Sequence, residues 1–225
     1  DGKKVQAFME KDPSKLPWGK LGVDVVLECT GFFRSKEQAA MHLAAGAKKV
    51  IISAPAKGDG VNTYMQGVNA QKYKGEDIID NASCTTNCIA PIAAIIEAKW
   101  GIKKAYMTTI HAMTSDQMLV DGPHKDLRRA RTAPQNIIPT TTGAAIATGK
   151  VIKSLNGKFD GMSIRVPVSV VSLADFTFVL KKGATAEAVN SHLKKMAASP
   201  MFRGIIDVTD EPLVSSDFIG NEHSS

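Results

Sequence analysis

The sequence predicts an α/β protein in two parts, a partial parallel sheet with helices followed by an α+β part on a mostly antiparallel sheet. Short, continuous apolar runs at residues 23–29 and 49–53 are typical of strands buried on both faces of a parallel sheet. Beyond residue 100 the runs are longer and alternate apolar with polar residues, as in a sheet with one packed and one exposed face. The pattern changes near residue 80, so we place the boundary between residues 82 and 83.

The first part contains a strand-helix-strand unit, because residues 35–45 have helical character and lie between the two apolar runs. Each predicted strand ends in small or polar residues, Thr30 and Gly31 after the first strand and Ser53 after the second. Open α/β sheets bind ligands at the carboxyl edge of their strands. This edge is therefore a candidate ligand site.

The second part is predicted to begin with an apolar, Ala-rich helix over residues 89–100. Its strands are expected at residues 104–111, 161–168 and 170–180. An amphipathic helix is expected over residues 187–199, with these candidate inward positions: Ala188, Leu193, Met196 and Ala197. Residues 115–136 show neither periodicity, and an irregular loop of about twenty residues inside a compact domain is usually functional.

The composition narrows the class of protein. The chain has 225 residues, 44% hydrophobic and 22% charged, as expected for one or two globular domains with a core. No apolar run approaches the roughly 18 residues of a membrane span, so no membrane partner is expected. The net charge of +6 has its densest cluster at residues 125–131, but no aromatic ladder accompanies it. Nucleic acid is therefore not expected as the main partner.

The cysteine and histidine pattern argues against disulfides and metals. Cys84 and Cys88 stand four apart and could meet as a pair, yet with Cys29 remote they resemble thiols of a cytoplasmic protein. No second Cys/His cluster has the spacing of zinc ligands, so no metal is expected. The remaining histidines are expected at the surface or satisfied in the core: His42, His124, His192 and His223.

Cys84 has surroundings that suit a reactive thiol. The polar residues from Ser83 to Asn87 favour helix N-termini, where a thiolate is stabilised and backbone N–H groups can hold an oxyanion. His111, at the end of a predicted strand, could serve as ion-pair partner and base if the fold brings it close. Free cysteine is also often an inert buried hydrophobe, and the residue types alone leave both readings open.

Several unusual strings occur together and in a fixed order: Glu28-Cys-Thr-Gly-Phe32, Ala82-Ser-Cys-Thr-Thr-Asn-Cys88, His111-Ala112 with Thr114, Pro139-Thr-Thr-Thr-Gly-Ala-Ala145, Asn156-Gly-Lys, Arg165-Val-Pro167 and Ser215-Ser-Asp-Phe218. In this order they resemble phosphorylating glyceraldehyde-3-phosphate dehydrogenase, from about residue 4 to residue 225. The loop at residues 115–136 resembles the S-loop of the family's bacterial branch.

The resemblance implies a Rossmann-type dinucleotide-binding domain, of which residues 1–82 would be the remainder, and a catalytic domain over residues 83–225. It implies glycolytic oxidation and phosphorylation of glyceraldehyde 3-phosphate to 1,3-bisphosphoglycerate with NAD. Cys84 would attack the aldehyde to form a thiohemiacetal and then a thioester, with His111 as base. The closely similar erythrose-4-phosphate dehydrogenase is an alternative.

The resemblance also implies binding residues and an assembly. The substrate's phosphate would contact Thr114, Asp116 and Arg165. Inorganic phosphate would contact Ser83, Thr85, Arg129, Thr142 and Gly143. NAD would contact Thr30, Gly31, Ser53 and Ser115. Hydroxyls, glycine N–H groups and arginine forks are residue types that bind phosphate oxyanions. A cytoplasmic homotetramer is implied, with S-loops at a subunit interface.

The chain also departs from the family. Relatives open with a strand and a Gly-rich turn that holds the cofactor pyrophosphate, and no such motif occurs here. Relatives also continue past the last matching string. We therefore expect an internal portion of a dehydrogenase, with exposed sheet edges and no turnover by itself. The other hypotheses for such a portion are a Cys-His acyl-transfer activity and a non-enzymatic interaction module.

Overall fold

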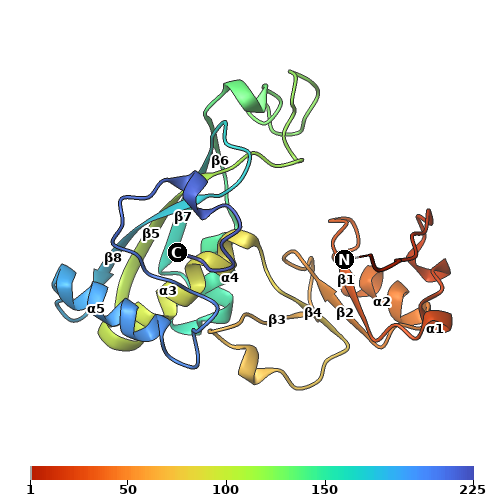
Figure 1. Cartoon of the computed structure of the whole chain (residues 1–225), viewed down its shortest axis with the longest axis horizontal. Coiled ribbons are helices and arrows are strands. Elements are labelled where there is room, and N and C mark those ends of the chain that lie inside the picture. Colours follow the sequence, from red (N-terminus) through yellow and green to blue (C-terminus); the bar gives the residue numbers. More distant parts are fainter. Residues whose placement is uncertain (1) are drawn as a thin grey trace. The chain divides into compact units, whose positions relative to one another are not determined.

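The computed structural model describes residues 2–225, which form two compact units (Figure 1). Unit 1 comprises the described residues up to Met65 together with Asn69–Ser83. Unit 2 comprises Gln66–Val68 and Cys84–Ser225. Each unit has its own sheet and its own core.

Unit 1 is built on a four-stranded sheet in which every pair of neighbours is parallel. In the order β1-β2-β4-β3, its strands are β1 (Val25–Glu28), β2 (Lys49–Ile52), β4 (Ile78–Asp80) and β3 (Asn62–Thr63). The strands expected at residues 23–29 and 49–53 are confirmed. β3 and β4 are only 2 and 3 residues long, too short for a periodic pattern to indicate them.

The crossover helix between the first two strands is α2 (Lys36–Ala44), which confirms the helix expected over residues 35–45. A capping box starts it: Ser35 Oγ accepts from Gln38 N at 3.2 Å, and Gln38 Oε1 accepts from Ser35 N at 3.1 Å. The core beneath α2 consists of Ala39, Val50, Ile52 and Ile78. The remaining helical turns of unit 1 are η1 (Pro13–Lys15), α1 (Trp18–Leu21) and η2 (Ala70–Lys72).

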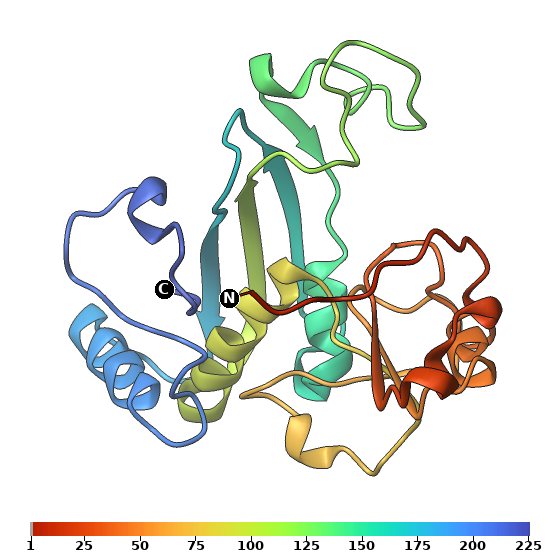
Figure 2. The same cartoon turned by 45° about the vertical axis from the view of Figure 1, so that its right-hand side comes forward.

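Unit 2 is built on a second four-stranded sheet, in the order β6-β7-β5-β8 (Figure 2). Its strands are β5 (Ile102–His111), β6 (Ile138–Thr140), β7 (Phe159–Arg165) and β8 (Leu173–Leu180). Its helices are α3 (Cys84–Trp100), η3 (Ala133–Gln135), α4 (Ala144–Val151), η4 (Lys153–Leu155), α5 (Ala186–Ala197) and η5 (Ser215–Phe218).

The expected mostly antiparallel sheet is confirmed, but its central pair is parallel. β5 pairs antiparallel with β8, and β6 pairs antiparallel with β7, whereas β5 and β7 run in the same direction. The connection from β5 to β7 includes the helix α4. It returns the chain to the end of the sheet at which β5 began, as two parallel neighbours require. Alternation along a strand carries no information about its neighbour's direction, so the sequence did not indicate this pair.

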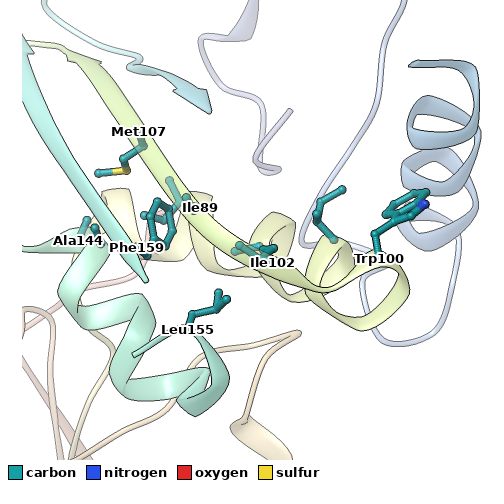
Figure 3. Packing of buried hydrophobic residues seen from close by; sticks show 11 residues of the cluster. Ile89, Trp100, Ile102, Met107, Ala144, Leu155 and Phe159 are labelled. Atoms are coloured by element: carbon teal, nitrogen blue, oxygen red, sulfur yellow. The ribbon is translucent and has the colours of Figure 1, made fainter. Parts of the chain in front are cut away.

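The core of unit 2 lies between helices α3 and α4 and one face of the sheet (Figure 3). Ile89 of α3, Ile102 and Met107 of β5, and Leu155 of η4 are each 0% exposed. Along β8, residues alternate strictly between exposed and half-buried positions, with Phe176 and Phe178 stacked on the inner face at 5.3 Å. This alternation explains why the sequence pattern located β5 and β8 well.

Several expected boundaries in unit 2 are wrong. Val171 has φ 70°, in the left-handed region that strands do not adopt, so β8 begins only at Leu173. β7 runs over Phe159–Arg165, where a strand was expected at residues 161–168. In α5, Ala188 is exposed, and Val189 packs against the core instead. Leu193, Met196 and Ala197 pack inward as expected, against this cluster: Ile95, Phe202 and Ile206.

β1 is an edge strand of the unit 1 sheet, and among the described residues it pairs only with β2. Val25 and Leu27, on one face of β1, are 47% and 65% exposed. In the part of the chain that the structure describes, no helix has the length and apolar character needed to cross a membrane.

Candidate active site

Cys84 is the first residue of α3, so it lies at the positive end of a helix of 17 residues. Its Sγ lies 3.6 Å from His111 Nε2 and 4.0 Å from Thr85 Oγ1. The side chain of Cys84 is exposed, unlike that of an inert core cysteine. The fold thus brings together the thiol and the imidazole that the sequence placed on different elements.

His111 is the last residue of β5, and its second ring nitrogen has two close neighbours. Nδ1 lies 2.7 Å from the carbonyl oxygen of Ala112, which only accepts hydrogen bonds, and 2.8 Å from Arg165 Nη1, which only donates them. These contacts hold the ring with Nε2 facing Cys84. An imidazole in this position can exchange a proton with the thiol.

The thiol of Cys84 has a depressed pKa. The hydrogen bond from His111 is the largest cause, and it outweighs the opposing effect of partial burial to lower the pKa from 9.0 to about 7. A thiol with this pKa is about half ionised near neutral pH. Cys88, one turn further along α3, contrasts with it, because burial raises the pKa of the Cys88 thiol.

Arg165 brings a positive charge to the same place. His111 and Arg165 end the parallel strands β5 and β7 as register partners. Arg165 Nη1 lies 2.8 Å from His111 Nδ1 and donates to Ala112 O at 3.1 Å and Thr114 Oγ1 at 3.3 Å. Burial and the nearby charge of Arg129 lower the pKa of Arg165. An anion bound here would offset the repulsion between the positive charges of Arg129 and Arg165.

The long loop contributes a second group of polar side chains. It carries no strand or α-helix, as expected, and extends beyond the ends of β5 and β7 (Figure 2). Within it Arg129 forms an ion pair with Asp116, and its Nε donates to Thr140 Oγ1 at 3.0 Å. Asp116 and Arg129, assigned by the sequence to different phosphate groups, are therefore direct partners. Arg129 lowers the pKa of Arg165, whereas Asp116 raises it.

The other residues expected to bind inorganic phosphate lie at two helix starts. Ser83 precedes α3 and Thr85 is in its first turn, while Gly143 is the N-cap of α4. Thr142 Oγ1 accepts from Ala144 N at 3.2 Å. Helix N-termini with hydroxyl side chains are suited to anions. The grouping of these residues with Arg129 in one phosphate site stays a prediction.

The expected cofactor residues of unit 1 lie at one sheet edge. Thr30, Gly31 and Ser53 are all exposed and follow β1 and β2, whose last residues Glu28 and Ile52 are register partners. A Cβ on Gly31 would meet no atom of the described residues within 4 Å. This open, polar edge fits a dinucleotide. Ser115 is exposed in unit 2.

Gln117 was not singled out by the sequence. Its side chain is 6% exposed, and its Oε1 accepts from Thr114 N at 3.2 Å while its backbone N–H donates to Thr114 O at 3.0 Å. It therefore holds Thr114 in place beside Arg165. A polar side chain three residues after a threonine is a common turn arrangement, but that signal is too frequent to indicate a site.

Comparison with known proteins bears on the family of the chain. The family model described as glyceraldehyde 3-phosphate dehydrogenase, C-terminal domain, matches residues 83–225, and that of the NAD binding domain matches residues 1–36. The chain belongs to the glyceraldehyde-3-phosphate dehydrogenase family. It is thus related to NAD-dependent oxidoreductases, and NAD is its cofactor.

Individual relatives are similar over all or nearly all of the chain. A glyceraldehyde-3-phosphate dehydrogenase of Zymomonas mobilis is 54% identical over 226 residues, covering 100% of this chain and 67% of that protein. Glyceraldehyde-3-phosphate dehydrogenase 1 of Bacillus subtilis is 52% identical, with the same coverage of both chains. A chloroplastic form B of Pisum sativum is 52% identical over 97% of this chain and 49% of its own length.

Proposed function

We propose that the protein oxidises and phosphorylates glyceraldehyde 3-phosphate to 1,3-bisphosphoglycerate, with Cys84 as nucleophile and His111 as base. The observation that carries the proposal is the 3.6 Å contact between Cys84 Sγ and His111 Nε2 at the start of α3. Family membership supports the reaction class. The depressed pKa of Cys84 supplies a thiolate at neutral pH.

In the first step, Cys84 Sγ forms a bond to the aldehyde carbon, and the thiol proton passes to His111 Nε2. The resulting alkoxide takes a proton from His111 to give a thiohemiacetal. His111 then removes the hydroxyl proton as the carbon loses its hydride, leaving a thioester on Cys84. NAD supplies the acceptor for that hydride.

In the last step, an oxygen of inorganic phosphate attacks the thioester carbon, and Cys84 leaves as the thiolate. The substrate's own phosphate would be held by Arg165 and Thr114, which lie beside His111, together with Asp116. Inorganic phosphate would be held at the helix starts by Ser83, Thr85, Thr142 and Gly143, with Arg129 completing the site. NAD would contact Thr30, Gly31, Ser53 and Ser115.

The test is NADH formation, followed by absorbance, with glyceraldehyde 3-phosphate, phosphate and NAD. We expect Cys84→Ser to abolish turnover and His111→Asn to lower kcat by roughly 10²–10⁴-fold, the range for loss of a general base. Comparable activity of Cys84→Ser would refute the proposal. Erythrose 4-phosphate as substrate separates the two related activities by their kcat/KM values.

A second candidate is acyl transfer without NAD, because the Cys84–His111 contact and its supports at Ala112 and Arg165 all lie in unit 2. This candidate predicts weak NAD binding and little dehydrogenase turnover from these 225 residues, in which no Gly-rich strand-turn-helix motif occurs. Hydrolysis of an activated ester that needs Cys84 but not NAD would support this candidate. Tight NAD binding would count against it.

We also propose a cytoplasmic homotetramer. Apolar side chains in the long loop are open to solvent: Leu119, Val120 and Leu127, at 70%, 77% and 82% exposure. Such side chains are typical of an interface. Cys29, Cys84 and Cys88 are all free thiols, which suits a reducing compartment.

A further inference from the structure

Two buried titratable side chains in unit 1 take no part in the chemistry at Cys84. Glu28, the last residue of β1, is 3% exposed, and His42 of α2 is 5% exposed. His42 Nε2 lies 2.9 Å from Glu28 Oε2. A buried carboxylate is stable only where hydrogen-bond donors replace its water, so its partners are informative.

The protonation state of His42 follows from its contact with Trp18. The indole Nε1 of Trp18 lies 3.0 Å from His42 Nδ1 and can only donate. Nδ1 is therefore an acceptor without a proton, and the single N–H of the neutral ring is on Nε2, facing Glu28. The contact between His42 and Glu28 is thus a hydrogen bond from a neutral ring to a carboxylate rather than an ion pair.

The second carboxylate oxygen of Glu28 holds the turn that follows β1. Oε1 accepts from the backbone N–H of Thr30 at 2.8 Å and also accepts the Thr30 hydroxyl. Thr30 Oγ1 in turn accepts from Phe32 N at 3.1 Å. Gly31, between them, has φ +77° and open space at its Cβ position among the described residues. Glu28 therefore fixes the segment Thr30–Phe32.

We propose that Glu28 is a positioning residue for the NAD site. We also propose that its side chain must accept hydrogen bonds only, because Trp18 holds His42 in the tautomer whose N–H faces Glu28. This inference rests on the proposed function, in which NAD contacts Thr30 and Gly31. Glu28 would act through Thr30 and would not itself touch the cofactor, because its carboxylate is buried beneath the turn.

Only a carboxylate meets the donors in this arrangement. In Glu28→Gln, the new amide NH₂ must face either the Thr30 N–H or the His42 Nε2–H, and each of these is a donor. Removing the indole N–H with Trp18→Phe allows His42 to adopt the other tautomer, with the proton on Nδ1. Nε2 can then accept from the new amide. Trp18 and His42 both line an open pocket, so water there can accept from Nδ1–H once the indole is gone.

The experiment compares wild type, Glu28→Gln, Trp18→Phe and the double variant. We expect Glu28→Gln to raise the Kd for NAD about tenfold, as for one unsatisfied buried donor, with Trp18→Phe close to wild type. The double variant should recover most of the affinity. Calorimetric titration with NAD gives the Kd, and ¹⁵N NMR without NAD gives the His42 tautomer, expected as Nε2–H in wild type and Nδ1–H in the double variant.

Glu37→Gln is the matched control, because it removes an exposed carboxylate from α2, the helix that carries His42, and should leave the Kd unchanged. A Kd unchanged in folded Glu28→Gln, or a double variant no better than the single, would overturn the inference while leaving the proposed function intact. Should Glu28→Gln fail to fold, the double variant decides: it must fold and bind NAD nearly as wild type does. Wild type that binds no NAD would overturn the cofactor site and this inference together.

Discussion

Cys84 and His111 form the contact on which the chemistry depends, and each is supported by a different local feature. α3 places Cys84 at a helix N-terminus, while Ala112 O and Arg165 Nη1 hold the ring of His111 through Nδ1. The consequence is a thiol pKa of about 7. Since that pKa lies below its ordinary value, ionised Cys84 favours the folded state at alkaline pH, and this contribution is lost as pH falls through about 7.

The first prediction concerns the alkylation of Cys84. In a Cys29→Ser/Cys88→Ser background, its rate with iodoacetamide should follow a titration with a midpoint near pH 7. His111→Asn should move the midpoint toward 9.0 and lower the rate at pH 7 by roughly 50-fold, because the thiolate fraction falls from about one half to about 1%. An unchanged midpoint in His111→Asn would show that the helix start alone activates the thiol.

Arg165 provides the second prediction. Because its Nη1 contacts both Ala112 O and Thr114 Oγ1, the fork geometry of arginine should matter as well as its charge. Arg165→Lys is expected to raise the KM for glyceraldehyde 3-phosphate by about tenfold or more, the cost of a charge-assisted hydrogen bond, with a smaller change in kcat. Arg203→Lys, at an exposed position, is the control. Equal losses in both variants would argue against a phosphate contact at Arg165.

Among the elements, the parallel pair β5 and β7 does most to form the site, because their shared ends place His111 beside Arg165. Close approach of the two strands depends on Gly161. A Cβ there would lie 2.5 Å from Met107 Cγ and 2.7 Å from the Met107 carbonyl oxygen. The backbone atom cannot move aside as a flexible side chain can, so this position requires glycine.

The third prediction follows from that contact. Gly161→Ala should destabilise unit 2 by roughly 1–3 kcal/mol, the usual cost of overpacking, as measured by urea unfolding. Gly183→Ala is the matched control, since its added Cβ meets no described atom within 4 Å and its φ is not positive. If both variants unfolded at the same urea concentration, the strand spacing would not depend on Gly161.

A fourth prediction concerns the start of α2 in unit 1. In the capping box, Ser35 Oγ accepts a hydrogen bond from Gln38 N, and the Ser35 backbone N–H donates one to Gln38 Oε1. Ser35→Ala removes the first and should lower the stability of unit 1 by about 1 kcal/mol. Ser191→Ala, at an exposed position within α5, should have little effect. Thermal melting of both variants checks this difference.

For the whole molecule, the question is how copies of the chain associate. The exposed apolar side chains of the long loop, Leu119, Val120 and Leu127, are candidates for the interface of the homotetramer that we propose. Val120→Glu/Leu127→Glu should therefore shift the mass measured by light scattering from tetramer toward smaller species. Val214→Glu, at a position 63% exposed outside this loop, should not. A tetramer that persists in the loop variant would exclude this loop as an essential contact.

The local features were determined by the sequence itself. The apolar runs located β1 and β2, and polar residues ahead of an apolar stretch placed Cys84 near a helix start, because hydrophobic period and capping depend only on neighbours along the chain. The sequence strings that resemble the family added His111 and Arg165 to the candidate site. β3, β4 and β6, each of two or three residues, carried too little pattern to be predicted.

Contacts between residues far apart in the chain were decided only by the tertiary structure. The parallel direction of β5 and β7, the pairing of Arg129 with Asp116, the contact of Arg165 with His111 and the tautomer of His42 all depend on such contacts. The physical reason is that strand register and hydrogen-bond direction are set by the partner across the gap, and a side chain's own sequence neighbours do not specify that partner.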